Sequence, residues 1–327
     1  MPTILHITNH EGTIKNLENV CYHLQYPLQT LKNNLPYYIS KTHADECWHD
    51  FSHIVKDFQI LFFTDTTMYA RPFLQNMDKH DAFIIIYITN RYDWGFFGNH
   101  SEDRVLYDEL YSRWSNHPRV FFTADNRYDR WLAASYGIHF RDNDIIRLIP
   151  ELRTGVSPTN VHKMFLYNRG TPIHCYREHL DKHQITYDIY GPWYTRYRDT
   201  AHIAEYLGII HLPYQTNIQS LWENLGHGNV YFIPSKTFLT HLIFHTDWYY
   251  WEEKTKPTVL QSIELAEWYQ EDLRECFVYF DDWEDLANQI DNIDILQKKA
   301  TIFSIVEKSN VENLDKWKKW VNNLISV

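Results

Sequence analysis

The stretch from His211 to Ser235, HLPYQTNIQSLWENLGHGNVYFIPS, holds the residues best suited to binding a charged ligand. Its middle predicts a helix, because apolar side chains recur with the i, i+3, i+4, i+7 spacing of one buried helix face. These apolar side chains are Ile218, Leu221, Trp222 and Leu225. The first turn of such a helix presents unpaired backbone N–H groups and the positive end of the helix dipole, and both suit a diphosphate.

Polar residues around this helix complete the candidate site. Thr216 or Asn217 can cap its start, and Gly226 or Gly228 can end it before the next strand. Glu223 lies near the far end on the polar side, where its carboxylate can accept two hydrogen bonds from the vicinal hydroxyls of a ribose. The plainer alternative for Glu223 is an exposed helix residue without a ligand.

Two other strand ends carry candidates for the same ligand. In FLYNRGTP, Arg169 is permanently charged and can pair with phosphate through two hydrogen bonds, and Asn168 can orient it. In IYGPW, Gly191 lets the backbone approach a ligand, and Trp193 and Tyr194 can stack on a base. The alternatives are a turn arginine paired with an acid, and a turn closed by an aromatic plug.

The first half of the chain offers a candidate proton acceptor and candidate hydroxyl-binding groups. In ITNHEGT, His10 or Glu11 can act as a general base, since either type takes a proton near neutral pH when its surroundings tune it. In TNRYDWG, Asn90, Arg91 and Asp93 can bind the hydroxyls of an acceptor. Two more polar strand ends, TDTT (64–67) and TADNRYD (123–129), are similar, although such ends are common without a function.

Short apolar runs that suit buried strands alternate with helical segments, and this alternation predicts parallel sheets. The runs are Thr3–Thr8, Ile60–Thr64, Phe83–Thr89, Arg119–Thr123, Ile145–Ile149, Lys163–Tyr167, Thr186–Tyr190, Gly208–Leu212, Asn229–Pro234 and Cys276–Phe280. The segment PELRTGVSP (150–158) is the best linker and splits these runs five and five. We therefore predict an α/β protein of two doubly wound Rossmann-like domains that face a cleft, with ligands beyond the carboxyl ends of the strands. The last stretch, 311–325, predicts an amphipathic helix.

Composition limits the classes of protein. The 327 residues suit two domains, and the net charge of −11 disfavours a nucleic-acid-binding face. The four cysteines are far apart, which fits reduced thiols, and HExxH is absent. The first residues lack the pattern of a signal peptide, and no apolar run is long enough to span a membrane. A soluble cytoplasmic protein, at most peripheral to a membrane, is expected.

The order of helix, glutamate, glycine-containing turn and strand ending in Pro-Ser resembles the donor-binding segment of GT-B glycosyltransferases. The resemblance implies an acceptor-side domain at 1–155, a nucleotide-sugar-binding domain at 156–300, and a helix at 301–327 that packs back on the first domain. It implies that Glu223 binds the ribose of the donor and that Arg169 holds its diphosphate. Many retaining members carry a second glutamate eight positions earlier, where this chain has Gln215, so the retaining motif is incomplete. The implied donor-binding set is Asn168, Arg169, Tyr190, Gly191, Gln215, Thr216, Asn217, Ser220 and Glu223.

The sequence therefore predicts a glycosyltransferase that moves a hexosyl or pentosyl group from a nucleotide-sugar to a hydroxyl of a glycan or glycoconjugate. No metal or other cofactor is expected, because the one Asp-x-Asp, at 142–144, precedes a predicted strand. A dehydrogenase is disfavoured because GxGxxG does not follow the first strand, and a P-loop is also missing. A GT-B-like nucleotide-sugar epimerase and a non-catalytic glycan-binding protein stay open as alternatives.

Overall fold

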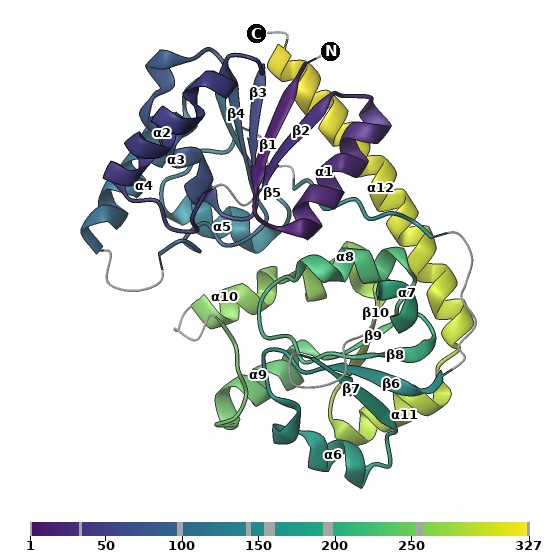
Figure 1. Cartoon of the computed structure of the whole chain (residues 1–327). Helices are drawn as coiled ribbons and strands as arrows, with labels where there is room; N and C mark the ends of the chain where they lie inside the picture. The colour runs from purple at the N-terminus through teal and green to yellow at the C-terminus, as the bar shows by residue number, and fades with distance from the viewer. Residues whose placement is uncertain are drawn as a thin grey trace. The chain divides into compact units, whose positions relative to one another are not determined.

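The computed structural model describes residues 2–32, 35–96, 101–141, 145–153, 161–191, 199–252 and 258–325. The chain divides into two compact units (Figure 1). Unit 1 comprises Met1–Ile149 together with Val311–Val327, and unit 2 comprises Pro150–Asn310. Most of the linker predicted at 150–158, the aromatic pair Trp193 and Tyr194, and the Asp-x-Asp at 142–144 lie outside the described residues.

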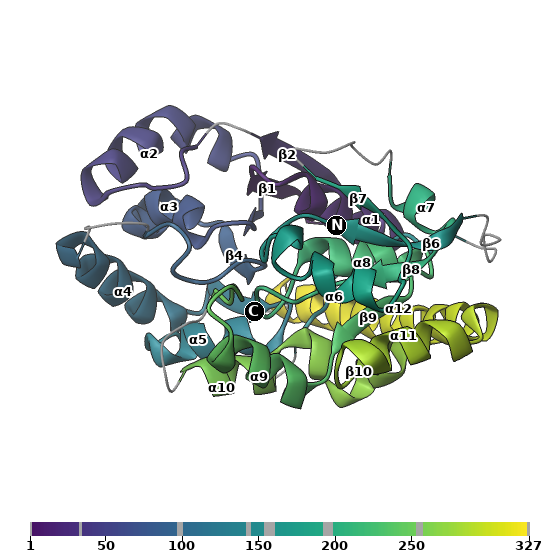
Figure 2. The same cartoon turned by 90° about the horizontal axis from the view of Figure 1, so that it is seen from below.

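Unit 1 contains a parallel five-stranded sheet in the order β2-β1-β3-β4-β5. Its strands are β1 (Ile4–Thr8), β2 (Leu28–Lys32), β3 (Ile60–Phe63), β4 (Phe83–Ile88) and β5 (Val120–Ala124). Its helices are α1 (Glu11–Leu24), α2 (Lys41–Val55), α3 (Arg71–Gln75), α4 (Ser101–Ser115) and α5 (Arg127–Ser135), with short 3-10 turns at Thr67–Ala70 and Met77–Lys79. Helices α2, α3 and α4 gather on one side of the sheet in both views (Figures 1 and 2).

Unit 2 repeats this arrangement with a second parallel sheet in the order β10-β9-β8-β6-β7. Its strands are β6 (Val161–Tyr167), β7 (Tyr187–Tyr190), β8 (Tyr206–Ile210), β9 (Tyr231–Pro234) and β10 (Phe277–Phe280). Its helices are α6 (Arg177–Lys182), α7 (Thr200–Ile203), α8 (Gln219–Gly226), α9 (Lys236–His245), α10 (Thr258–Leu265), α11 (Trp283–Asn292) and α12 (Ile295–Ile325), with 3-10 turns at Ile173–Cys175, Glu267–Tyr269 and Glu271–Cys276. The last part of α12 belongs to unit 1.

The two sheets share one topology. Counted along the chain within each unit, the strand order is second, first, third, fourth, fifth in both. The predicted fold class, two doubly wound Rossmann-like domains of the kind that the resemblance to GT-B enzymes implies, is thus confirmed. In both sheets the connections reverse direction between the first and third strands, β1 and β3 in unit 1 and β6 and β8 in unit 2. Ligands of such sheets bind beyond the carboxyl ends of the strands at this switch point.

One predicted strand is wrong and one strand was missed. Ile145–Ile149 is extended and largely buried but joins neither sheet. The N–H of Ile146 donates to the carbonyl of Ala124, the last residue of β5, at 3.1 Å. Other backbone groups bond to side chains, as when the Tyr87 hydroxyl donates to the carbonyl of Ile146 at 2.6 Å and Asn19 donates to that of Ile149 at 3.0 Å. The fifth strand of unit 1 is instead β2, an edge strand whose half-exposed side chains form no apolar run.

The helix boundaries follow from local sequence. The side chain of Asp282 accepts a hydrogen bond from the backbone N–H of Asp285 and caps α11, as the acidic start of this segment predicts. The amphipathic helix predicted at 311–325 is the end of α12, and its Trp317 packs on Phe62 and Tyr87 in the core of unit 1.

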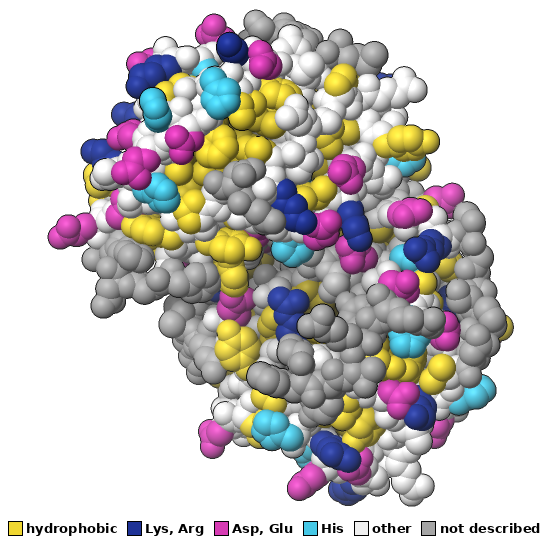
Figure 3. Space-filling view, viewed as in Figure 1, with side chains coloured by type: hydrophobic (Ala, Val, Ile, Leu, Met, Phe, Trp, Pro, Cys, Tyr) yellow, Lys and Arg dark blue, Asp and Glu magenta, His cyan; other side chains and the backbone are white. Residues whose placement is uncertain are grey.

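Among the described residues, none of the helices combines the length and the apolar character that crossing a membrane requires. On the face shown in Figure 3, acidic and basic side chains alternate over the surface.

Candidate nucleotide site

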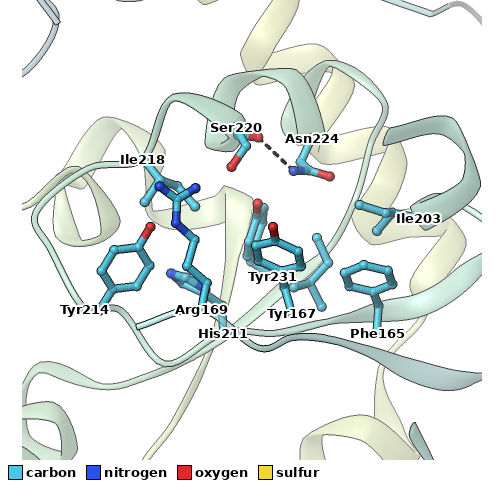
Figure 4. A pocket seen from close by; sticks show the side chains of 11 residues that line it. Phe165, Tyr167, Arg169, Ile203, His211, Tyr214, Ile218, Ser220, Asn224 and Tyr231 are labelled. Carbon is cyan, nitrogen blue, oxygen red and sulfur yellow. Dashed lines mark hydrogen bonds between the residues drawn. The ribbon is translucent and has the colours of Figure 1, made fainter. Parts of the chain in front are cut away.

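A cavity of about 100 Å³ lies in unit 2 at the carboxyl edge of the sheet, between the strands and α8 (Figure 4). Its side chains come from β6 and β8 and the segments that follow them, from the first residue of β9, from α7 and from α8. Because β6 and β8 flank the switch point, the cavity occupies the position at which doubly wound sheets bind ligands. Aromatic rings from Phe165, Tyr167 and Tyr231 line its sheet side.

Arg169 supplies the positive charge of the cavity. Its guanidinium is exposed and lies 5.8 Å from the centre of the Tyr214 ring, and no carboxylate pairs with it among the described residues. Figure 4 shows it beside Ile218, the residue that precedes α8. An arginine without an acidic partner keeps its charge and its paired donors available for a phosphate.

The start of α8 adds backbone donors on the same side. The residue before the helix is Ile218, which is in an extended conformation and makes no side-chain capping hydrogen bond. The predicted caps, Thr216 and Asn217, are therefore wrong. The backbone carbonyl of Thr216 accepts a hydrogen bond from the backbone N–H of Glu267, and that of Asn217 accepts one from the side-chain amide of Gln215. This segment is therefore held in place one to two residues before the position that caps the helix.

The rest of α8 agrees with the prediction. The apolar face is buried at Leu221, Trp222 and Leu225, the helix ends at Gly226, and Gly228 adopts a φ of 70°. Gly228 is thus the left-handed residue that ends the helix. Ser220 in the first turn lines the cavity.

His211 forms the floor of the cavity, although it is not among the residues predicted to bind the donor. Burial, with a contribution from Arg169, lowers the pKa of His211 to about 3, so the imidazole is neutral at physiological pH. The ring packs against Trp268 with 4.7 Å between centroids, and its Nε2 is buried without a hydrogen bond. In the neutral imidazole, a ring nitrogen in this position can form one hydrogen bond with a ligand, as donor or as acceptor according to the tautomer. Its position depends on packing between distant segments, which no local motif reveals.

The other residues predicted to bind the donor lie around this cavity or support it. Asn168 accepts a hydrogen bond from the backbone N–H of Ile173 at 3.0 Å, and its Cβ lies 3.2 Å from the position that a Cβ on Gly191 would take. Tyr190 is buried and stacks on Phe165 with 4.8 Å between centroids. These residues shape the end of β6 and β7, while Arg169 and Ser220 line the cavity itself.

Glu223 and Gln215 lie outside the lining of the cavity. Glu223 is half-buried on α8, and its carboxylate has no ion pair among the described residues. It lies three positions after Ser220, close to one helical turn further along. Its predicted role as a ribose ligand stays a prediction.

The predicted residues of unit 1 lie at the carboxyl edge of the other sheet. The Nδ1 atom of His10 accepts a hydrogen bond from the N–H of Gly12 and caps α1, and Glu11 is exposed and forms an ion pair with Lys32. Arg91 and Asp93 form an ion pair with 3.3 Å between Nε and Oδ1. Asn90 is half-buried after β4 and accepts a hydrogen bond from the N–H of Arg91. Across the described residues, His, Cys, Asp and Glu side chains nowhere gather in threes as metal ligands would.

No protein-family model and no curated protein matches the sequence. Several solved structures are similar to it, among them the following two. One is TarM, with a TM-score of 0.47 and 12% identity over 86% of this chain, which spans 58% of the length of TarM. The other is a Listeria monocytogenes protein assigned as a UDP-N-acetylglucosamine 2-epimerase, with a TM-score of 0.45 and 8% identity over 93% of this chain and 90% of that one.

Proposed function

We propose that the protein is a glycosyltransferase that takes a sugar from a nucleotide-sugar and transfers it to a hydroxyl of a glycan or glycoconjugate. The observation that supports this most is the cavity at the switch point of unit 2. There the guanidinium of Arg169, which has no acidic partner among the described residues, lies beside the start of α8. Two independent sources of positive potential at one sheet edge fit a diphosphate.

The same groups would assist the reaction. When the bond between the sugar and the diphosphate breaks, negative charge grows on the leaving phosphate oxygen. Donors that already point at this oxygen stabilise the transition state without having to rearrange. We assign this role to Arg169 and to the first N–H groups of α8. Ser220 and the neutral His211 would bind uncharged parts of the donor, and Glu223 its ribose.

Nucleotide binding is tested by thermal unfolding of the full chain with UDP, GDP, ADP, CMP and their common sugar conjugates. A ligand that binds only the folded state raises the melting temperature by mass action. We expect one nucleotide family to raise it, and we expect Arg169→Ala to lose most of that rise. Arg177→Ala is the matched control, because Arg177 is an exposed arginine of α6 that lies outside the cavity.

No rise with any nucleotide, or an equal rise in the Arg169→Ala and Arg177→Ala proteins, would refute the proposed site. The activity is then tested with the stabilising nucleotide-sugar and a set of glycan acceptors, followed by analysis of the products. A new glycosidic bond supports transfer. A donor converted to its epimer without an acceptor would replace the transferase with the epimerase alternative.

A further inference from the structure

Two histidines lie one turn apart at the end of α9, on the surface of unit 2. His241 and His245 are four residues apart, which places their side chains on the same face of the helix. Both residues are exposed, and their ring centroids are 5.0 Å apart. Neither of them lines the candidate nucleotide cavity, so the pair is separate from the site described above.

The separation of the two rings suits a metal ion held between them. A ligating imidazole nitrogen lies about 2.1 Å from a zinc ion, which puts the centre of each ring roughly 3.2 Å from the ion. For two ligands that subtend about 90–110° at the ion, the ring centres are then about 4.5–5.2 Å apart. The observed 5.0 Å falls within this range. Because both side chains are exposed, their rings can rotate toward an ion without a shift of the backbone.

The aromatic neighbours of His241 hold its ring near this geometry. The ring stacks on that of Phe238, with 6.4 Å between centroids and 14° between the planes. Phe238 in turn packs on Phe280 and Trp283, with centroids 5.9 and 5.6 Å away. A ligand that is already positioned loses less side-chain entropy when the ion binds.

The end of α9 also favours a cation. His245 is the last residue of the helix, and the last turn carries the negative end of the helix dipole. The one lysine of α9, Lys236, begins the helix and pairs with Glu264 at 2.8 Å. An ion between His241 and His245 would therefore be attracted by the helix and would meet no lysine or arginine of α9.

The same spacing of histidines occurs at two other helices, but without the contact between rings. His49 and His53 on α2 are both exposed, and no ring contact joins them. His179 on α6 lies four residues before His183, but its ring is stacked on Trp283 with 4.9 Å between centroids. Of these three described pairs, the one at the end of α9 has its rings at a chelating distance.

We propose that His241 and His245 chelate a divalent transition-metal ion, with water completing its coordination. Imidazole is a good ligand for Zn²⁺, Cu²⁺ and Ni²⁺. Structural zinc sites have four protein ligands, whereas two ligands leave positions open and allow the ion to exchange. The described residues contain no group of three metal-ligating side chains, which agrees with a site of two. The proposal does not rest on the transferase function.

Calorimetric titration of the full, tag-free chain with ZnCl₂ at pH 7.5 tests the site. We expect one Zn²⁺ ion per chain to bind more tightly than any other. His241→Gln and His245→Gln should each weaken this binding at least about tenfold, because the second ligand of a chelate acts at a high effective concentration. His49→Gln is the matched control, since it removes one exposed histidine of a pair with the same spacing, and it should leave the binding unchanged.

Glutamine is a good helix former, and circular dichroism checks that each variant is folded. Testing both positions means that either variant carries the result if the other does not fold. No binding of Zn²⁺, or equal binding by the folded His241→Gln and His49→Gln proteins, would overturn the proposal. So would a single variant that halves the number of bound ions and keeps their affinity, because each imidazole would then bind an ion of its own.

Discussion

Gly170 determines where the side chain of the preceding Arg169 can lie. Its φ is 74°, and a Cβ at this position would meet the ring of Tyr214 at 2.4 Å. The close contact allows Tyr214 to lie under the guanidinium, with which it makes the cation–π contact. One small residue thus positions both a charge and the ring that supports it.

We therefore expect Gly170→Ala to be harmful in two ways. The left-handed backbone and the clash with Tyr214 together should lower the free energy of unfolding by about 3 kcal/mol. Nucleotide binding should weaken as Arg169 moves. The matched control is Gly137→Ala in unit 1, where φ is 83° but the nearest atom is the Ser112 hydroxyl oxygen at 3.1 Å, so the loss should be about 1 kcal/mol. Chemical denaturation measures both losses, and equal losses would contradict the role of Tyr214.

Asp65 gives a second prediction, on stability. Burial raises its pKa from 3.8 to about 6, so the folded protein binds a proton more tightly than the unfolded chain does. Between these values stability falls as pH rises, and above pH 6 the full cost of the buried charge is present. Asp65→Asn should therefore raise the free energy of unfolding by about 3 kcal/mol at pH 7.5 and by less than about 1 kcal/mol near pH 4. Urea unfolding at both pH values measures this, and a stabilisation independent of pH would show that the charge is not its cause.

At the scale of elements, the strands that could be predicted are those that are buried on both faces, because their sequences are continuous apolar runs. β3 and β4 are buried almost throughout, and their Ile- and Phe-rich runs predict them well. β2 was missed because it is an edge strand with one partner, and none of its side chains is buried. Ile145–Ile149 is as apolar as a strand, but its backbone is bonded by side chains such as Asn19 and Lys316, which lie far away in the sequence.

The candidate site was predictable to a similar extent. Arg169 and Ser220 could be found because each follows a strand or begins a helix, and both features are local. The floor of the cavity could not, since His211 matters through its burial against Trp268 and through its nearness to Arg169. In unit 1, Asp65 lies in a stretch that is typical of any polar strand end, and only the packed structure reveals its burial.

At the scale of the whole molecule, α12 is shared between the units. Its first half belongs to unit 2, where Ile302 and Val306 are buried, and its last part belongs to unit 1, where Trp317 is 1% exposed. Trp317 lies 5.5 Å from Phe62 and 5.3 Å from Tyr87 between ring centroids. Unit 1 therefore needs a segment that follows all of unit 2 in the chain.

Separate cores predict separate responses when the protein unfolds. Trp317→Ala removes a buried ring and should lower the free energy of unfolding of unit 1 by about 3–5 kcal/mol. Because that core and the proposed nucleotide site lie in different units, calorimetry of this variant should show an early transition that a bound nucleotide does not move. A later transition should rise with nucleotide, and Arg169→Ala should abolish the rise. A single transition shifted by both the substitution and the nucleotide would mean that the units unfold as one, since a shared cooperative transition responds to every perturbation in either part.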